Sequence, residues 1–455
     1  MTSTGKPDRF TMMTETPVPT LIIKLAIPTI ISMLVTALYN MADTYFVGQI
    51  PENATQATAA VGIVFPMMAV IQAFGFMFGH GSGNFLSRKL GAGDIKEADE
   101  MASSGFAMAL ITGAVLAVLG NVFINTVVNI LVSDDVSANT VAMTGQYAQI
   151  ILIGAPFMMC QFVINNQLRF QGSAVYAMAG LLCGALMNVI LDPILILALG
   201  LGVRGAAIAT ITGQITSFFV LLFGSTRGEN IRLSIKNVRI NGYYIGQVIN
   251  GGIPSLFRQG LAAVSTMLLN RAAGEFGGDP AIAGMSITTR VMMLLISALL
   301  GFGQGFQPVC SFNYGAEKKK RVHEGYWFCV KYGTIFLSVL AIIFYIFAPD
   351  VIHFFRDDEQ VVAVGKIALR CQAVVLPLNA MLIITNMTLQ SIGKGIKASI
   401  TSSCRNGICF IPVILILPRI FGLTGVEITQ TVADVLTFFV TLPFAVSVLK
   451  ELKEQ

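Results

Sequence analysis

Apolar stretches, each long enough to cross a lipid bilayer, follow one another along almost the whole chain. A helix needs about 20 mostly apolar residues to span the hydrocarbon core. Short segments rich in Gly, Asn, Lys and Arg separate the stretches. The pattern predicts twelve membrane-spanning helices, at about 21–47, 58–84, 100–122, 143–167, 175–200, 203–224, 245–270, 281–309, 326–348, 362–390, 397–418 and 424–447.

The composition supports the prediction of a membrane protein. The chain is 55% hydrophobic and 12% charged, whereas a soluble domain carries about 25% charged residues. The apolar spans leave no segment for a soluble domain, so we expect an all-α polytopic membrane protein. The polar opening does not resemble a cleavable signal peptide, and the first span is expected to be retained.

Positive charge in the loops predicts the topology. Loops after even-numbered spans hold 14 Lys and Arg residues, and loops after odd-numbered spans hold 4. Cytoplasmic loops carry the excess of Lys and Arg. The even-numbered loops and both termini are therefore expected in the cytoplasm.

The chain also repeats itself. The exit of span 2, GHGSGNFLSRKLGAG from Gly79, matches the exit of span 8, GQGFQPVCSFNYGAE from Gly303, at an offset of 224 residues. Pro28 matches Pro254, and Gly202 matches Gly422. Six spans per half give both halves the same topology, which predicts two bundles related by a pseudo-two-fold axis along the membrane normal. The predicted parts are a tail at 1–20, an N-lobe at 21–224, a linker at 225–244, a C-lobe at 245–447 and a tail at 448–455.

Two carboxylates break the repeat. Asp43 in span 1 corresponds to Leu269, and Asp192 in span 5 corresponds to Ile411. A charged side chain at mid-membrane costs roughly 2.5–3.5 kcal/mol on insertion scales. Because only the first half keeps these acids, we expect them to have a chemical role in that half.

Three further polar residues lie at a similar depth. Asn188 is four residues before Asp192 and shares its helix face, while Thr210 and Tyr147 lie early in spans that return from outside. Together with Asp43 they would supply carboxylate, amide and hydroxyl oxygens to one cavity. Two carboxylates away from water favour a shared proton or a bound cation, and hard cations prefer oxygen ligands. The alternative is that the uncharged members only hold helices together through hydrogen bonds.

Two prolines are predicted bend points. Pro28 lies inside span 1, and Pro193 follows Asp192 in span 5. Proline removes a backbone donor and weakens the helix locally. The carbonyl freed near Asn188 could join the polar site.

These residues resemble the MATE family of multidrug and toxin exporters, in particular its DinF-like branch and MepA-type members. The resemblance covers all twelve spans and is carried by the paired glycine-rich exits and by Pro28, Asp43, Tyr147, Asn165, Asn188, Asp192, Pro193 and Thr210. It implies a V-shaped, two-lobed fold with alternating access. It also implies a proton or Na⁺ site at Asp43, Asn188, Asp192 and Thr210, with Tyr147 in their network, and a substrate cavity lined by Asn165, Asn188 and Asp192.

The expected function is export of amphipathic, often cationic compounds in exchange for H⁺ or Na⁺. The expected setting is the bacterial plasma membrane, with a monomeric chain, no cofactor, no nucleic-acid partner and no enzymatic activity. Gly200–Gly205 fits GxGxxG but joins two spans, so it does not predict dinucleotide binding. The main alternative is a flippase for a lipid-linked saccharide, which would need a strongly cationic cavity.

The second half has its own charged residues within spans. Relatives of another branch carry an acid on span 7, where this chain has Arg258. We expect some of these charges to pair across helices as a C-lobe polar network. The alternative is that the long side chains extend to the membrane surface. The residues are Arg258, Arg290, Arg370, Arg405, Glu427 and Asp434.

Overall fold

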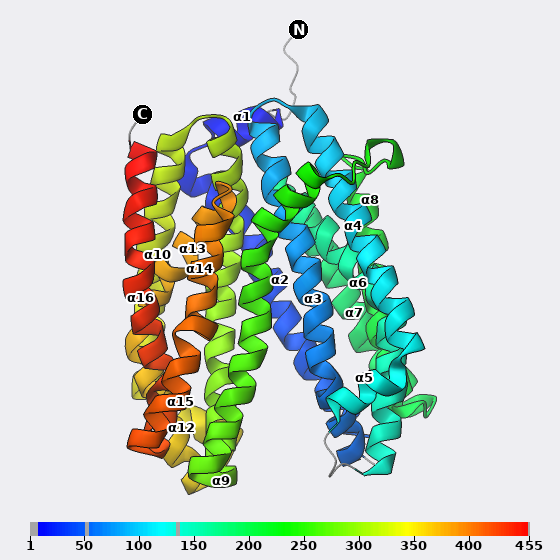
Figure 1. Cartoon of the computed structure of the whole chain (residues 1–455), viewed down its shortest axis with the longest axis vertical. Helices are drawn as coiled ribbons and strands as arrows, with labels where there is room; N and C mark the ends of the chain where they lie inside the picture. The colour runs from blue at the N-terminus through cyan, green and yellow to red at the C-terminus, as the bar shows by residue number, and fades with distance from the viewer. Residues whose placement is uncertain (1–7, 51–53, 133–136, 454–455) are drawn as a thin grey trace. The chain divides into compact units, whose positions relative to one another are not determined.

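The computed structural model describes residues 8–50, 54–132 and 137–453. Over these residues the chain forms helices joined by short turns, with no β-strand (Figure 1). The elements are α1 (Arg9–Glu15), α2 (Val18–Val47), α3 (Ala54–Gly91), α4 (Ile95–Val122), α5 (Ile124–Leu131), α6 (Ala138–Phe170), α7 (Ala174–Asp192), η1 (Pro193–Ala198), α8 (Gly202–Ser225), η2 (Ile235–Asn237), α9 (Gly242–Gly315), α10 (Lys319–Ile346), α11 (Ala348–Phe355), α12 (Glu359–Val375), α13 (Leu378–Ser391), α14 (Gly395–Ser403), η3 (Cys404–Ile408), α15 (Phe410–Phe421) and α16 (Leu423–Lys453).

The helices account for the predicted spans. Ten helices in the described part are long and apolar enough to cross a membrane, and α12 with α13, bent by 59°, would form an eleventh. Helix α9 is counted once although it runs for 74 residues, which would be about 110 Å of continuous helix. Its backbone leaves the helical region at Gly278 (φ 65°, ψ −160°), so α9 is two helices that meet there. The all-α membrane fold is therefore confirmed.

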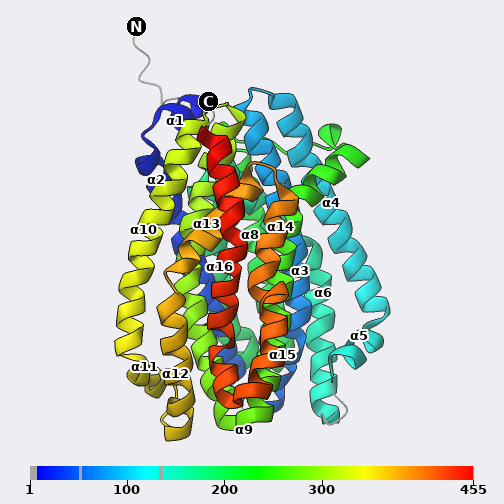
Figure 2. The same ribbon diagram turned by 60° about the vertical axis from the view of Figure 1, so that its left-hand side comes forward.

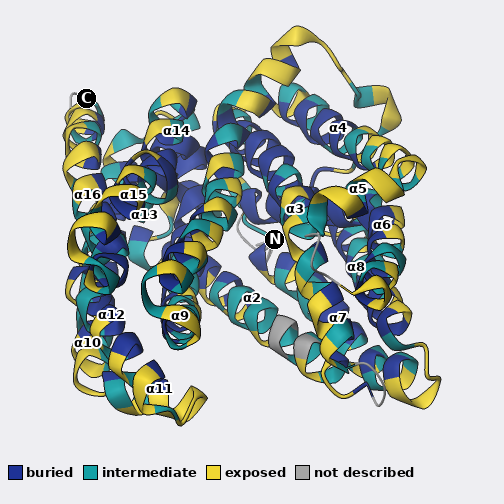
Figure 3. Cartoon of the chain, turned by 60° about the horizontal axis from the view of Figure 1, so that its bottom comes forward, coloured by how far each residue is buried: buried dark blue, intermediate teal, exposed yellow. Residues whose placement is uncertain are grey.

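Large apolar side chains face outward, as a lipid environment requires. On α16 the exposed set includes Leu436, Phe439 and Val446, and on α10 it includes Val339 and Ile342. Figure 3 shows this exposed surface on the outer helices and buried residues between helices. Exposing such apolar surface to water would cost about 25 cal/mol per Å², so these side chains fit a lipid environment.

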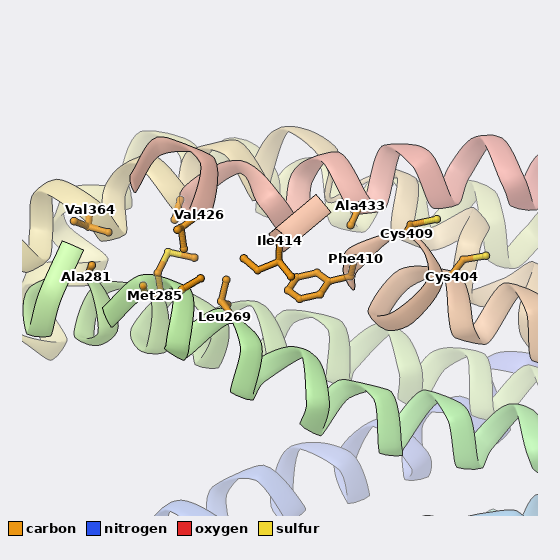
Figure 4. Packing of buried hydrophobic residues seen from close by; sticks show 13 residues of the cluster. Leu269, Ala281, Met285, Val364, Cys404, Cys409, Phe410, Ile414, Val426 and Ala433 are labelled. Carbon is orange, nitrogen blue, oxygen red and sulfur yellow. The ribbon is translucent and has the colours of Figure 1, made fainter. Parts of the chain in front are cut away.

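The chain folds into two compact units. The N-unit is Ile31–Gly252, and the C-unit is Met1–Ile30 with Ile253–Gln455. In the N-unit, α6 packs against α3, α4, α7 and α8, and Ile164, Leu168, Ala177 and Leu221 form a buried cluster. In the C-unit, α16 contacts α10, α12, α13 and α15 (Figure 2). One of its cores includes Met285, Phe410, Ile414 and Val426, with Ile414 beside the Phe410 ring (Figure 4).

The unit boundaries fall inside α2 and α9, not in the linker 225–244 that divides the predicted lobes. Glycines explain the boundary in α2. The start of α2 packs on α9 within the C-unit: a Cβ on Gly305 would lie 2.4 Å from the Cα of Ala26, and Thr29 donates to the carbonyl of Gly301 at 2.7 Å. The residues of α2 before Ile31 therefore belong to the compact unit formed mainly by the second half of the chain.

The same arrangement recurs at the start of α9. A Cβ on Gly81 of α3 would lie 2.2 Å from the carbonyl oxygen of Val248, and one on Gly252 would lie 2.2 Å from the carbonyl oxygen of Met77. All four residues belong to the N-unit. The repeated glycines at the exits of spans 2 and 8 thus allow close packing. Gly81 packs against the start of α9, and Gly305 packs against the start of α2.

Backbone turns repeat at the same offset. After α3, Asp94 N donates to Lys89 O, and after α9, Lys318 N donates to Asn313 O. Gly93 has φ 80° in the first turn, whereas Glu317 has φ 59° in the second. Glu317 is the one non-glycine residue with positive φ in the described part of the chain. The repeat therefore keeps a left-handed residue at this turn even where glycine is absent.

Candidate cation-coupling site

The five polar residues predicted to converge all lie in the N-unit. Asp43 is on α2, Tyr147 on α6, Asn188 and Asp192 on α7, and Thr210 on α8. Asp192 is fully buried, and Tyr147, Asn188 and Thr210 expose 5% or less of their surface. Four helices thus contribute side chains to one buried region.

The end of α7 shapes the acidic part of the site. Asn188 Nδ2 donates to Asp192 Oδ1 at 3.4 Å, as expected for residues one turn apart. Pro193 directly follows and begins the π-helical turn η1. Within that turn Leu199 N donates to Ile194 O, one residue further back than in an α-helix. The missing N–H of proline explains why the α-helix ends at Asp192, and π turns are frequent at functional sites.

The acids and the tyrosine form one electrostatic cluster. Asp43 and Asp192 are close enough to interact with each other. Tyr147 interacts with both carboxylates and approaches Thr210, and its hydroxyl also contacts the sulfur of Met68 at 3.9 Å. The structure therefore brings Asp43, Tyr147, Asp192 and Thr210 together, with Asn188 attached through Asp192.

The cluster presents several buried oxygens without hydrogen-bond partners among the described residues. These are Oδ1 of Asp43, Oδ1 of Asn188, Oδ2 of Asp192 and Oγ1 of Thr210. Leaving one such atom unpaired costs about 1–3 kcal/mol, and more for a charged group. A proton on a carboxylate or a hard cation such as Na⁺ would relieve that cost. The donor set consists of oxygens, so it fits either ion.

Two residues absent from the prediction join the cluster. Tyr39 interacts with Asp43 and approaches Gln214, and Oε1 of Gln214 is another buried oxygen without a partner among the described residues. Tyr39 precedes Asp43 by four residues, and Gln214 follows Thr210 by four. The helical i, i+4 relation could have identified both from the sequence.

Small residues let α7 and α8 approach at this site. A Cβ on Gly213 would lie 2.7 Å from the carbonyl oxygen of Gly184 and 3.1 Å from Cβ of Asn188. A Cβ on Gly184 would lie 2.7 Å from the carbonyl oxygen of Gly213. The two glycines thus set the position of Asn188 relative to α8.

Asn165 makes a contact outside this cluster. Its Nδ2 donates to the carbonyl of Ala177 at 2.9 Å, which joins α6 to α7. In the C-unit, Asn386 donates to the carbonyl of Ala398 at 2.7 Å, also twelve residues further along the chain. This contact is repeated in both halves and holds two helices together; the cavity-lining role of Asn165 remains a prediction.

The charged residues of the C-unit lie in different settings. Arg405 pairs with Asp434 at 2.9 Å, while Arg370 donates to the carbonyl of Tyr345 at 3.0 Å. Arg258 has a 3.5 Å contact with the hydroxyl of Ser255, and Arg290 is exposed.

Glu427 is buried beside Cys371. Within the described ranges neither it nor Arg258, Arg290 or Arg370 forms an ion pair. The structure therefore brings only one acid and one base of the predicted C-lobe network together.

Fold and site define the class as helical integral membrane proteins with a buried acidic site inside a helix bundle. The family model MatE matches residues 28–194 and 254–416. The chain therefore belongs to the MatE family of multidrug efflux transporters, which confirms the resemblance noted in its sequence. It is a transporter rather than an enzyme.

Curated relatives agree with this assignment. The multidrug export protein MepA of Staphylococcus haemolyticus (strain JCSC1435) is 27% identical over 418 residues, covering 92% of this chain and 91% of that protein. MepA of Staphylococcus aureus (strain MRSA252) is 25% identical over 430 residues, covering 94% of both. Relatives of this name in bacteria support a protein of the cell membrane.

Solved structures resemble the whole chain. An outward-facing multidrug resistance MATE family transporter of the MOP superfamily is 25% identical, with a TM-score of 0.90 over 99% of this chain and 100% of that one. A MOP superfamily transporter from Pyrococcus furiosus, described as having a binding pocket of reversed polarity, is 26% identical with the same TM-score and coverage.

Proposed function

We propose that the protein is a secondary antiporter that exports amphipathic, often cationic compounds in exchange for H⁺ or Na⁺. Asp43 and Asp192 hold the coupling ion, Asn188 and Thr210 supply further oxygens, and Tyr147 orders the acids. The observation that carries this proposal is the set of buried oxygens without partners at two interacting carboxylates. The family supplies the transporter class, and these residues supply the reason for ion coupling.

Coupling follows from competition between conformations. An ion or a drug shifts the equilibrium only as far as it binds one state better than the other. When both acids are ionised, their mutual repulsion and their oxygens without hydrogen-bond partners destabilise the conformation in which they lie close together. A bound proton or Na⁺ relieves both effects. One charge moved through 100 mV is worth about 2.3 kcal/mol, and one pH unit adds about 1.4 kcal/mol. A single ion can therefore sustain drug gradients of tens- to hundreds-fold.

The two prolines are the proposed bend points for alternating access. Pro28 lies two residues before the point at which α2 passes from the C-unit to the N-unit, and Asp43 is further along the same helix. Pro193 separates α7 from the π turn η1. Asp192 is thus adjacent to the weakened part of its helix, whereas Asp43 lies about 22 Å along α2 from Pro28.

Replacing Asp192 with Asn tests the role of the acids. We expect Asp192→Asn to remain folded and to lose ion-driven drug efflux, because the amide cannot carry the exchanged charge. Asp43→Asn is expected to behave in the same way. Asp99→Asn, on α4 outside the cluster, is the matched control and should retain efflux. Normal efflux by folded Asp192→Asn protein would refute the assigned role.

Inside-out vesicles can identify the coupling ion. The outer face of such vesicles is the cytoplasmic face of the membrane, on which the loop charges predict both termini. Proton coupling predicts drug uptake when the lumen is acidic, and Na⁺ coupling predicts uptake when the lumen holds Na⁺. Uptake that needs neither gradient would contradict antiport.

The flippase alternative is less well supported by the charges. Recognition of a pyrophosphate-linked saccharide would call for a strongly cationic cavity, whereas the candidate site holds two interacting acids, Asp43 and Asp192. Growth of drug-sensitive cells on ethidium, with and without the protein, separates the two functions. We further propose that the active species is a monomer, since the candidate site is complete within one chain.

A further inference from the structure

The C-unit contains a second buried polar cluster, around Asp434 of α16. Its carboxylate accepts hydrogen bonds from Arg405 (Nε, 2.9 Å, and a weaker one from an Nη at 3.4 Å). It also accepts from Asn379 Nδ2 at 3.2 Å and from Gln430 Nε2 at 2.8 Å. Only 2% of the Asp434 side chain is exposed, against 22% for Arg405. One guanidinium and two amides thus surround a single buried carboxylate.

This cluster overlaps the counterpart of the N-unit site on the side formed by α8. Helix α8 begins at a left-handed glycine, Gly202 at φ 53°, and α16 directly follows another, Gly422 at φ 59°, which gives an offset of 220 residues. At that offset Gln430 corresponds to Thr210, and Asp434 corresponds to Gln214.

The arginine has a counterpart as well. The matched contacts of Asn165 with Ala177 and of Asn386 with Ala398 are 221 residues apart. At that offset Arg405 corresponds to Gly184, the residue that lets α7 approach α8. The N-unit therefore has a glycine and unpaired oxygens where the C-unit has an arginine and a paired carboxylate.

We propose that Arg405 is a tethered cation that permanently occupies the C-unit's counterpart of the cation site. Its guanidinium neutralises Asp434 within the protein, so the C-unit does not exchange an ion. If the proposed function holds, coupling takes place in the N-unit alone, with one ion site per chain. The occupancy by Arg405 itself does not depend on that function.

Two oxygens on the helices of this cluster are consistent with this assignment. Oδ1 of Asn379, which is fully buried, and Oγ1 of Thr431 have no hydrogen-bond partner in the described part of the chain. Without the guanidinium, the Asp434 carboxylate and the Asn379 amide that contacts it would form an anionic pocket that contains several oxygens. Removing one partner of a buried ion pair leaves an uncompensated charge and is strongly destabilising. A small external cation is then expected to bind and restore stability.

The test is thermal unfolding of purified protein in detergent. All variants carry Asp192→Asn, so that the N-unit site does not respond to added ions. We expect Arg405→Ala to lower the Tm, and guanidinium or Na⁺ at low millimolar concentration to raise it in a saturable manner. Choline chloride at equal ionic strength should have no such effect. Protein with Arg405 intact should show no saturable shift.

The matched control makes both positions uncharged, as their N-unit counterparts Gly184 and Gln214 are. Arg405→Ala combined with Asp434→Gln removes both charges and should lose the saturable response. A folded Arg405→Ala protein without a saturable shift, or an equal shift in the double variant, would overturn the proposal. If purification of Arg405→Ala gives no folded protein, folded protein from the double variant supports the proposal. If neither variant gives folded protein, Arg405 is needed for packing and the proposal is overturned. Drug transport is not measured, so failure here leaves the N-unit proposal intact.

Discussion

A single methyl group at Gly213 should disturb the candidate site without replacing any of its polar side chains. In Gly213→Ala the new Cβ would lie 2.7 Å from the carbonyl oxygen of Gly184, where ordinary contacts begin at 3.4 Å. The other close atom is Cβ of Asn188 at 3.1 Å. Since the nearest obstacle is backbone, α7 and α8 must separate locally by about 0.7 Å, and Asn188 with Asp192 moves with α7.

A shift of this size should reduce both stability and coupling. Overpacking of this kind costs about 1–3 kcal/mol, and a misplacement of about 1 Å at a reacting site can cost a hundredfold. We expect ion-driven drug transport in proteoliposomes to fall by roughly tenfold or more, with a lower Tm. Gly62→Ala is the control, because no atom lies within 4 Å of its Cβ; transport should be unchanged. Wild-type transport and ion affinity in folded Gly213→Ala protein would refute the reasoning.

Three further predictions follow from particular contacts. Glu317→Gly should raise stability by roughly 0.5–1 kcal/mol in thermal unfolding, because glycine adopts the positive φ of this turn without strain; no change would mean that Glu317 is unstrained. Gly305→Ala should lower stability by about 1–3 kcal/mol, since its Cβ would lie 2.4 Å from Ala26. Gly260→Ala, with no atom within 4 Å, is its control, and equal stability of the two variants would contradict the close-approach explanation. Gln214→Ala should weaken binding of the coupling ion several-fold without unfolding the protein, as measured by ion-dependent Tm shifts; unchanged affinity would exclude Gln214 from the site.

Much of the fold could be predicted from the sequence because membrane helices obey a strong local rule. A span must be about 20 apolar residues long, and its backbone must be satisfied internally. The helical class and the doubled glycine-rich exits were therefore readable without tertiary structure. The break at Gly278 also falls between the predicted spans 245–270 and 281–309.

The units could not be predicted in the same way. The sequence places the division in the polar linker 225–244, whereas the compact units change inside α2 and α9. Polar segments show where the chain leaves the membrane. They do not show which helix packs against a set of glycines. The close contacts of Gly81 with Val248 and of Gly305 with Ala26 decide that question, and they join residues far apart in the chain.

The candidate site shows the same division. Its acids were evident because ionisable groups are costly in an apolar span, and Asn188 followed from helical spacing to Asp192. The same spacing places Tyr39 beside Asp43 and Gln214 beside Thr210, but only the packing of α2 near α8 in the N-unit brings the two pairs together. Likewise the sequence offered four arginines in spans of the second half, and only tertiary packing selected Arg405 as the partner of Asp434. Composition and periodicity act along one helix, whereas pairing depends on distances between helices that no local pattern encodes.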